Sequence, residues 1–427
     1  MSADQTSGMT RRNFAKASAA ATFAILSSKG AKAQQNSETL KIGLLGCGGR
    51  GSGAAQQILQ GNENVQLVAL ADLFEDKAQQ GRKRFTEHSD SRVSSKVAID
   101  DGHMFTGLDA YKKILESDID IIIEATLPYS RPKHIEAAVE AKKHIFTEKP
   151  AASDPAGIRQ FMAAGRKHKE MGLTFVAGTQ RRHHSGYIEG IKKIHDGSIG
   201  DVQFLRAHWC GGLPFVHPRD PKWSDLEYRI RNWYGYNWVC GDNIVEQHVH
   251  NLDVCNWIMN GHPEAVFASG GRAWKPRTEP YGDLYDNFSC EYEYAGGVFM
   301  LSMSRHWDGC DGGVFEAAVG TKGKWNSKLP EDCPPPAVDP YVQEHIDLVN
   351  SIRGTGPKWH QAEEVAESTL TAIMGRISAY TGKRLTWDEA MNMEGSIVPA
   401  EWSFDLEYPV GPIPVPVKPE IVNKLQA

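Results

Sequence analysis

The sequence lacks the features of several protein classes. It has only seven cysteines in 427 residues, none spaced as Cys-x-x-Cys, which excludes a disulfide scaffold and a zinc-ribbon or thioredoxin-like motif. No apolar run reaches the roughly 18 residues of a transmembrane helix. The net charge of −6 argues against the basic stripe of a nucleic-acid binder. With 41 glycines and 22 prolines, the chain is neither collagen-like nor disordered, and its length suggests two or three domains.

The first 33 residues have the pattern of an export signal. Residues 10–16 read TRRNFAK, residues 17–26 are modestly apolar, and residues 31–33 form a small-x-small cleavage pattern. The paired arginines and the lysines near the cleavage site favour the twin-arginine route, which carries folded proteins. A disordered basic N-terminus is the alternative. We therefore expect residues 1–33 to engage the twin-arginine export machinery and the mature protein to be periplasmic.

A glycine-rich turn follows the first predicted strand. Residues 40–45 predict a strand, residues 54–59 a helix, and GCGGRG between them fits Gly-x-Gly-x-x-Gly. Such glycines let a pyrophosphate approach the helix N-terminus. A second strand, 65–71, ends at Asp72, whose carboxylate can bind both ribose hydroxyls and would repel a 2′-phosphate. The sequence thus predicts NAD as cofactor, held by Gly46, Gly48, Gly49, Arg50, Gly51 and Asp72. Arg50 would weaken the preference for NAD over NADP if it reached the phosphate position.

Strands and helices then alternate. Strands are predicted at 119–124, 144–147 and 173–177, and helices at 134–141 and 154–171. This alternation indicates a parallel sheet covered on both faces, with ligands at the carboxyl ends of its strands. Further cofactor contacts are therefore expected at the ends of two strands: Thr126, Pro128, Glu148 and Lys149.

The motif Glu148-Lys149-Pro150 lies at one such strand end. A lysine beside a nicotinamide could orient a substrate hydroxyl or share its proton, whereas a plain surface lysine is the alternative. Together with the glycine loop and Asp72, the motif resembles the glucose-fructose oxidoreductase / inositol dehydrogenase / MocA (Gfo/Idh/MocA) family over about residues 38–390. The resemblance implies that Lys149 is catalytic and touches both substrate and nicotinamide.

The same family has an aspartate, a histidine four residues later and an aspartate three further on. Glu246, His250 and Asp253 hold this spacing here, which would place them on one face of a helix. The resemblance makes His250 the acid/base for a sugar hydroxyl. Independently, oxidation of a secondary alcohol needs a base, and histidine titrates nearest neutral pH; a structural core histidine is the alternative. Glu246 is a longer acid than the family's aspartate, so the resemblance does not fix its contacts to substrate hydroxyls or the identity of the substrate.

The same stretch offers a possible metal site, because His248 adds a fourth potential ligand within eight residues. In a helix, however, His248 and His250 point roughly 200° apart. No second cluster completes a ligand set, so no catalytic metal is expected.

The second half predicts another architecture. Strands at 202–208, 265–273, 286–294, 298–305 and 313–320 indicate a large, mostly antiparallel open sheet. Helices are predicted at 187–195, 341–351 and 363–381, and the proline-rich end reads as an extended arm. The expected fold is α/β: a signal (1–33), a Rossmann domain (37–180), an α+β substrate-binding and oligomerisation domain (181–397) and the arm (398–427).

All 11 tryptophans follow residue 200. Their flat faces suit the apolar faces of sugar rings, although sheet packing or a subunit interface explains most of them. A basic turn after the last nucleotide-domain strand lies where the two domains meet, and a solvated turn is its alternative. The predicted substrate contacts are Arg181, His183, His184, Asp253, Trp209 and Trp233, with Trp307 as a further candidate facing the cleft.

Together these patterns predict an exported NAD-dependent oxidoreductase acting on a secondary hydroxyl of a sugar, polyol or glycoside. Because free NAD is scarce outside the cytoplasm, the cofactor is expected to stay bound. Two alternatives remain: an NAD-dependent glycosidase that uses transient oxidation, elimination and re-reduction, and a non-catalytic sugar-binding protein of the same fold. A homodimer or homotetramer is implied by the resemblance alone, and neither a nucleic-acid partner nor a membrane span is expected.

Overall fold

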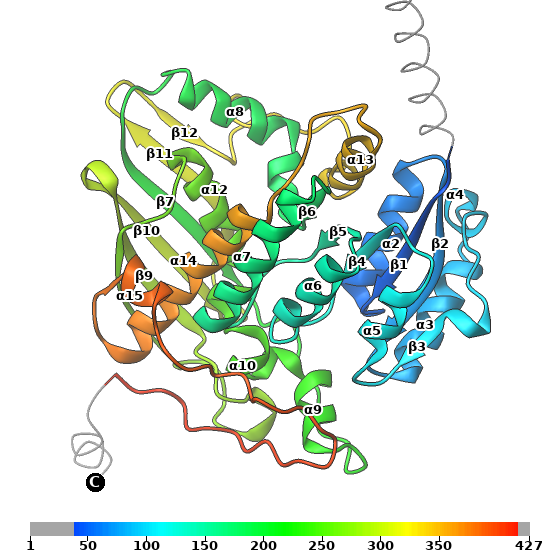
Figure 1. The fold of residues 1–427 in the computed structure, drawn as a ribbon. Helices are drawn as coiled ribbons and strands as arrows, with labels where there is room; N and C mark the ends of the chain where they lie inside the picture. Colours follow the sequence, from blue (N-terminus) through cyan, green and yellow to red (C-terminus); the bar gives the residue numbers. More distant parts are fainter. Residues whose placement is uncertain (1–37, 417–427) are drawn as a thin grey trace, which may run out of the picture.

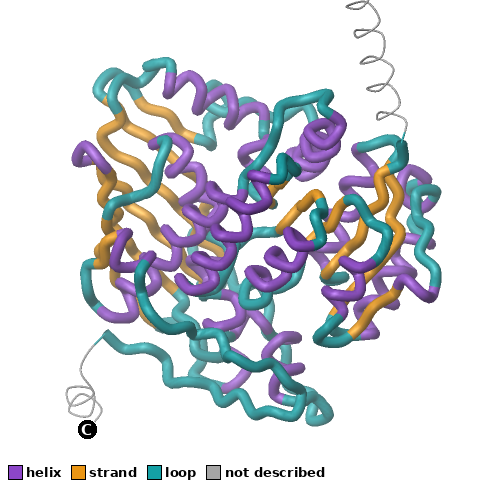
Figure 2. The backbone as a smooth tube through the Cα atoms, in the orientation of Figure 1, coloured by secondary structure: helices purple, strands orange, loops and turns teal. Residues whose placement is uncertain are grey.

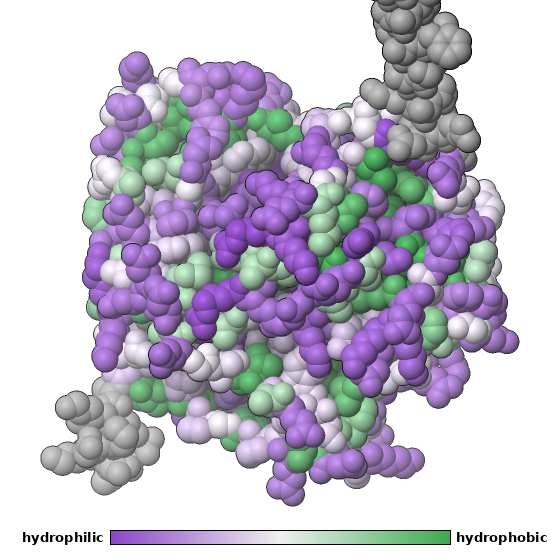
Figure 3. Space-filling model, in the orientation of Figure 1, coloured by the Kyte–Doolittle hydropathy of each residue, from purple (hydrophilic) through white to green (hydrophobic). Residues whose placement is uncertain are grey.

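Two β-sheets organise the chain, one parallel and one mixed (Figure 1). The computed structural model describes residues 38–416, so the predicted export signal and residues 417–427 lie outside it. Among the described residues, no helix is both long and apolar enough to cross a membrane. The face shown in Figure 3 is mostly hydrophilic, with hydrophobic patches scattered between hydrophilic residues.

The first sheet is parallel and has the strand order β3-β2-β1-β4-β5-β6. Its strands are β1 (Leu40–Leu45), β2 (Val65–Asp72), β3 (Met104–Thr106), β4 (Ile121–Glu124), β5 (His144–Thr147) and β6 (Phe175–Ala177). The helices between them are α2 (Gly49–Gly61), α3 (Glu75–Thr86), α4 (Ser91–Ser94), α5 (Ala110–Glu116), α6 (Arg131–Glu140) and α7 (Pro155–Glu170), with the 3-10 turn η1 (Asp101–His103).

Both faces of this sheet are buried. Ile42 and Leu44 of β1 pack into one hydrophobic cluster with α2, and Leu45 packs into another with α5 and α6. The first cluster also contains Leu348 of α13 (Pro340–Arg353), a helix from the far end of the chain. The predicted parallel sheet covered on both faces is thus confirmed, and a late helix helps to cover it.

The second sheet has the order β12-β11-β7-β10-β9-β8-β13. Its strands are β7 (Val202–Gly211), β8 (Ala265–Gly271), β9 (Asn287–Tyr294), β10 (Val298–His306), β11 (Gly313–Gly320), β12 (Lys324–Asn326) and β13 (Leu385–Thr386). Only β7 and β10 pair in parallel, so the sheet is mostly antiparallel as predicted, and the α/β fold class is confirmed. Its inner face packs on α12 (Val249–Met259) and α14 (Ala362–Thr381), while Phe267 and Phe299 on the other face are exposed.

The remaining elements are short. They are η2 (Gln180–His183), α8 (Ser185–His195), α9 (Asp225–Arg231), η3 (Trp233–Gly235), α10 (Asn237–Cys240), α11 (Asn243–Glu246), η4 (Glu279–Tyr281), η5 (Ala295–Gly297) and α15 (Trp387–Met391). Residues 398–416 contain no helix or strand and run along the surface beside α9 and α10 (Figure 2).

One predicted element is wrong: Glu246, His250 and Asp253 do not share a helix. Glu246 ends α11, and α12 begins only at Val249. The physical reason is that the Glu246 carbonyl accepts a hydrogen bond from Lys149 Nζ at 2.5 Å. The amide of His250 donates instead to the carbonyl of Gln247, three residues back. The helical ladder is therefore interrupted between Glu246 and His250.

Candidate active site

The turn after β1 can be made only with glycine. Gly46 has φ +98°, and a Cβ on Gly51 would lie 1.9 Å from the Gly46 carbonyl oxygen. By contrast, a Cβ on Gly48 or Gly49 would meet open space. Helix α2 begins at Gly49, and no side chain caps its first N–H groups. The loop thus offers bare backbone and a helix N-terminus, the arrangement that a pyrophosphate requires.

Asp72 ends β2 beside this loop. Its carboxylate accepts hydrogen bonds from the Cys47 amide at 2.7 Å and the Phe74 amide at 2.9 Å. Burial raises the pKa of Asp72 above its usual value. Each carboxylate oxygen retains a free lone pair, so Asp72 can hold the loop and still accept bonds from ribose hydroxyls.

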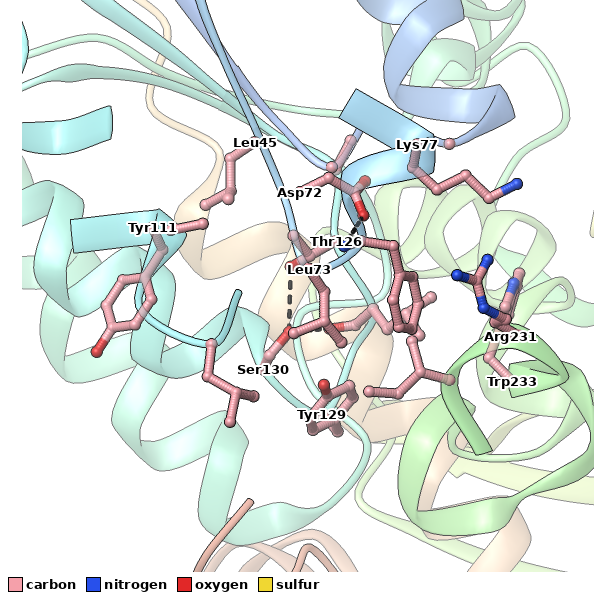
Figure 4. A pocket seen from close by; sticks show the side chains of 18 of the residues that line it. Leu45, Asp72, Leu73, Lys77, Tyr111, Thr126, Tyr129, Ser130, Arg231 and Trp233 are labelled. Atoms are coloured by element: carbon pink, nitrogen blue, oxygen red, sulfur yellow. Dashed lines mark hydrogen bonds between the residues drawn. The ribbon is translucent and has the colours of Figure 1, made fainter. Parts of the chain in front are cut away.

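Asp72 opens onto a cavity of about 460 Å³ (Figure 4). Of the residues predicted to contact cofactor or substrate, the structure places Gly46, Gly48, Gly49, Asp72, Thr126 and Trp233 in its wall. Gly51 packs behind the turn, and Pro128, Glu148 and Lys149 lie outside the lining of this cavity. The cavity wall also contains residues that were not predicted from the sequence: Leu73, Phe74, Lys77, Tyr129, Trp223, Arg231 and Trp402.

Arg50 points away from this cavity. Its guanidinium pairs with Glu148 at 2.5 Å and with Glu344 at 3.4 Å, and it lies 4.9 Å from the ring centre of Tyr341. The expectation that Arg50 could reach a 2′-phosphate beside Asp72 is therefore not met. Instead, the residue ties the glycine loop to the Glu-Lys-Pro motif and to α13.

Lys149 joins the two halves of the chain. Its ammonium donates to the Glu246 carboxylate at 2.8 Å as well as to the Glu246 carbonyl. Both side chains are largely buried. Tyr234 is buried near Glu246, and burial followed by the charge of Glu246 raises the pKa of its hydroxyl well above its usual value. Tyr234 is a site residue that the sequence reasoning missed, since it lies in a segment without clear periodicity.

His250 is buried next to this pair. Its ring stacks on that of Trp209, with centroids 6.0 Å apart and 21° between the planes. Burial, and then the charges of Lys149, Arg181 and Arg50, lower the pKa of His250 well below 6.5. The imidazole is therefore neutral at neutral pH and available as a base.

The predicted substrate contacts from the basic turn separate into two groups. Arg181 stays near His250: its guanidinium lies 6.0 Å from the Trp209 ring centre and pairs with the buried Glu316 at 2.6 Å. His183 and His184 are engaged in the framework. His183 bonds to Asp347 at 2.6 Å, and His184 caps the N-terminus of α8.

Asp253 is also engaged in the framework. It is 1% exposed, and Arg182 holds both of its oxygens at 2.9 to 3.1 Å. Ser368 donates a further bond. This carboxylate has no exposed oxygen for a substrate, so its predicted contact with substrate is not favoured by the geometry. Trp307 donates its indole N–H to Asp286, which also fixes it within the framework.

Within residues 38–416, no three histidine, cysteine, aspartate or glutamate side chains gather in the way that a metal ion requires. Glu246, His248 and His250 in particular diverge. His248 is wholly buried and bonds to Ser302 at 2.7 Å.

Comparison with known proteins identifies the architecture. Residues 40–175 match the model of an oxidoreductase family with an NAD-binding Rossmann fold, and residues 191–326 match the Gfo/Idh/MocA C-terminal domain. The chain belongs to the Gfo/Idh/MocA family. The matched Rossmann domain is NAD-binding, so NAD is the cofactor, and the glycine loop and Asp72 remain the residues predicted to hold it.

The relatives of this Gfo/Idh/MocA protein include dehydrogenases. Inositol 2-dehydrogenase of Acidothermus cellulolyticus is 26% identical over 55% of the chain and 58% of the relative. Myo-inositol 2-dehydrogenase of Thermotoga maritima is 22% identical over 54% of the chain and 58% of the relative. The matches thus span less than two thirds of these relatives.

Solved structures share the fold over a larger part of the chain. Scyllo-inositol dehydrogenase of Lactobacillus casei with bound NAD(H) and scyllo-inositol has a TM-score of 0.63 at 18% identity, covering 82% of this chain and 99% of its own. Aldose-aldose oxidoreductase of Caulobacter crescentus has a TM-score of 0.62 at 19% identity, covering 82% of this chain and 100% of its own. At these identities the likeness concerns the fold.

Proposed function

We propose that the protein oxidises a secondary hydroxyl of a polyol, sugar or glycoside to a ketone with NAD, or runs the reverse reduction of the ketone. The observation that carries the proposal is the contact between Lys149 and Glu246, which joins the carboxyl edge of the Rossmann sheet to the second domain beside the neutral His250. Inositol dehydrogenases among the relatives support a polyol as substrate class.

The side chains have distinct tasks in this reaction. Bound NAD supplies the hydride acceptor. His250 takes the proton of the reacting hydroxyl, because its depressed pKa keeps it unprotonated. Lys149 donates a hydrogen bond to the same oxygen and stabilises the negative charge that develops there. Glu246 holds Lys149 in place and accepts a bond from a neighbouring hydroxyl.

We further propose that the protein is exported with NAD already bound and keeps it, so that the hydride taken from one sugar is passed to a second sugar, or is returned to the same glycoside, while the cofactor stays on the protein. The twin-arginine pattern in residues 10–16 supports export of a folded holoprotein. A chain in which Arg11→Lys and Arg12→Lys are combined should remain in the cytoplasm. Recovery of that variant in the periplasm would contradict the twin-arginine route.

The decisive experiment begins with mass spectrometry of protein purified without added nucleotide. Recovery of NAD or NADH supports retention; its absence contradicts retention. The same material is then incubated with inositols, aldoses and aryl glycosides, following nicotinamide absorbance and released aryl alcohol. A change in absorbance with a polyol or sugar supports the dehydrogenase, whereas aryl alcohol released without net redox change would establish the glycosidase instead.

The matched variant is His250→Ala. It should lose several orders of magnitude in turnover, as expected for removal of a general base, yet keep its NAD. Unchanged turnover would remove His250 from the mechanism. If neither the wild type nor the variant turns over any of these substrates, the result favours the non-catalytic sugar-binding alternative.

A further inference from the structure

The cavity at Asp72 is closed by parts of the chain outside the Rossmann domain. On the nucleotide side it is lined by Leu73 and Phe74, which follow β2, and by Leu127, which follows β4. The opposite wall comes from the segment between β7 and α11 and from the C-terminal arm, through Phe215, His217, Trp223, Ile230, Arg231, Trp233 and Trp402. We call residues 213–240 and 398–408 the clamp.

The clamp is tied to the nucleotide domain by charge. Arg231 of α9 pairs with Asp76 of α3 through two contacts, at 2.8 and 3.2 Å. Its guanidinium also lies 3.9 Å from the ring centre of Phe74, two residues after Asp72. Arg231, which lies in the cavity wall (Figure 4), therefore makes a charged contact that bridges the two domains.

Aromatic packing forms a second attachment. Trp402 of the arm packs edge-on against Tyr129, with ring centres 4.7 Å apart, and Lys133 of α6 lies 4.9 Å from the Trp402 ring centre. The Tyr129 amide also donates to the carbonyl of Val239 in α10 at 3.3 Å. These residues belong to a third hydrophobic cluster, separate from the cores of the two sheets, which spans both domains.

The two parts of the clamp are also tied to each other. Arg229 donates from Nε and Nη2 to the carbonyl of Tyr408, at 3.0 and 2.8 Å. The Tyr408 amide in turn donates to the carboxylate of Asp225 at 2.9 Å. The arm is thus held against α9 as a single unit, and the two parts of the clamp have to move together.

From this arrangement we infer that the clamp closes over the adenosine half of NAD and sets the rate at which the cofactor is released. The inference rests on the proposed NAD-dependent function. Asp72 lies at the expected ribose position, and the slot beside it is lined by the apolar side chains of Leu73 and Leu127 and by the indole rings of Trp402 and Trp223. A planar purine is the part of the dinucleotide that suits such a slot.

Release then requires the clamp to lift. Lifting separates Arg231 from Asp76, removes the Trp402 ring from Tyr129 and exposes the third cluster to water. Because several contacts must break before NAD can leave, the clamp slows dissociation of NAD more than its association. Affinity differences at one site are mostly differences in dissociation rate. The clamp therefore gives a physical basis for an enzyme that keeps its cofactor where no NAD is available.

The test measures NAD release directly. Holoprotein is diluted into buffer with an NAD-consuming glycohydrolase, and the NAD remaining on the protein is followed with time. The clamp variants are Trp402→Ala and Arg231→Gln. Their controls are Trp387→Ala, another half-buried tryptophan, which stacks on His262, and Arg384→Gln, which loses an ion pair with Glu293 on the second sheet.

Both clamp variants should release NAD at least about tenfold faster than wild type, and both controls at the wild-type rate. Competition separates the halves of the cofactor. Trp402→Ala should weaken binding of 5′-AMP and leave binding of nicotinamide mononucleotide unchanged. If both clamp variants release NAD at the wild-type rate, and their thermal midpoints show that they are folded, the clamp proposal is wrong.

Failure of the clamp can be told apart from failure of the proposed function. If wild-type protein binds added NAD but the clamp variants release it no faster, the clamp is wrong and the function stands. If wild-type protein neither contains nor binds NAD, the proposed function fails first.

Discussion

Lys149 is the residue on which the catalytic interpretation depends most. Its ammonium contacts both the carboxylate and the carbonyl of Glu246, and its charge acts on His250. A cation and a neutral imidazole side by side form a usual pair for handling an alcohol proton, the cation favouring the alkoxide and the imidazole taking the proton. Two individual side chains, Lys149 and His250, therefore account for the proton transfer in the proposed reaction.

The pH dependence of turnover follows from His250. A base is active above its pKa, and burial together with nearby cations holds the pKa of His250 well below 6.5. We expect kcat/KM for oxidation of an active polyol to stay flat as the pH falls through 6.5 and to decline only further into the acid range. A pH profile that loses half its activity at or above pH 6.5 would contradict this assignment.

Two glycines of the loop should respond differently to alanine. In Gly51→Ala the new Cβ has no room beside the Gly46 carbonyl, so we expect a loss of about 1–3 kcal/mol of stability or more. Gly48 has φ −66° and open space around it, so Gly48→Ala should fold normally. Its methyl group would occupy the approach of the pyrophosphate and weaken NAD binding.

Thermal unfolding and NAD titration check this pair. Gly48→Ala should keep the midpoint of wild-type apoprotein while its Kd for NAD rises by about tenfold or more. Wild-type affinity in Gly48→Ala would mean that the pyrophosphate does not cross the loop there.

At the scale of elements, the gap between α11 and α12 sets the site. A regular helix would have required the Glu246 carbonyl for its own ladder, and Lys149 takes that carbonyl instead. The strands and helices predicted from apolar runs and periodicity agree with the structure to within a few residues, whereas α3, β3 and α5 were not predicted. The short turns between residues 212 and 246 have no such signal, because tertiary contacts hold them.

Helix α14 offers a test of electrostatics within one element. Burial and the nearby Glu363 and Glu364 raise the pKa of Glu367 from 4.5 to about 7. Because the pKa of Glu367 is higher in the folded protein than the ordinary 4.5, ionising Glu367 destabilises the folded protein at pH values above about 7. This destabilisation disappears below pH 4.5, where the carboxyl is protonated in both the folded and the unfolded state. After allowance for solvent screening, Glu367→Gln should stabilise the protein by about 1 kcal/mol at pH 8.

Chemical denaturation at pH 8 and pH 4.5 measures this effect. The gain from Glu367→Gln should be present at the higher pH and absent at the lower. The exposed Glu331→Gln serves as control and should show no such difference. An equal gain at both values would point to packing rather than charge.

At the scale of the molecule, the outer face of the second sheet stands out. Phe299 in β10 lies opposite Phe204 in β7, which lies opposite Val319 in β11, so apolar side chains form a row across three strands. Phe267 in β8 adds an exposed ring, 54% accessible to solvent. Glu291 and Glu293 of β9 separate Phe267 from this row. An exposed apolar row is typical of an interface, and we propose that copies of the chain pair through it.

Light scattering after gel filtration tests that pairing. Wild-type protein should have the mass of a dimer or tetramer, and Phe299→Glu should shift it towards a single chain by placing a charge in the interface. Ile188→Glu in α8, an equally exposed apolar position at 42%, should leave the mass unchanged. A wild-type monomer would contradict the proposed pairing.

The sequence by itself determined the nucleotide domain, its cofactor and the family. Glycine spacing, an acid at a strand end and apolar alternation act locally, so they are visible without coordinates. The tertiary structure decided what surrounds the cofactor. Only folding brings Arg231 to Asp76 and Trp402 to Tyr129, across 155 residues of chain in the first case. The tertiary structure also decided that Asp253 forms an ion pair with Arg182. Ion pairing depends on which elements meet in the fold and not on the spacing of residues along one element.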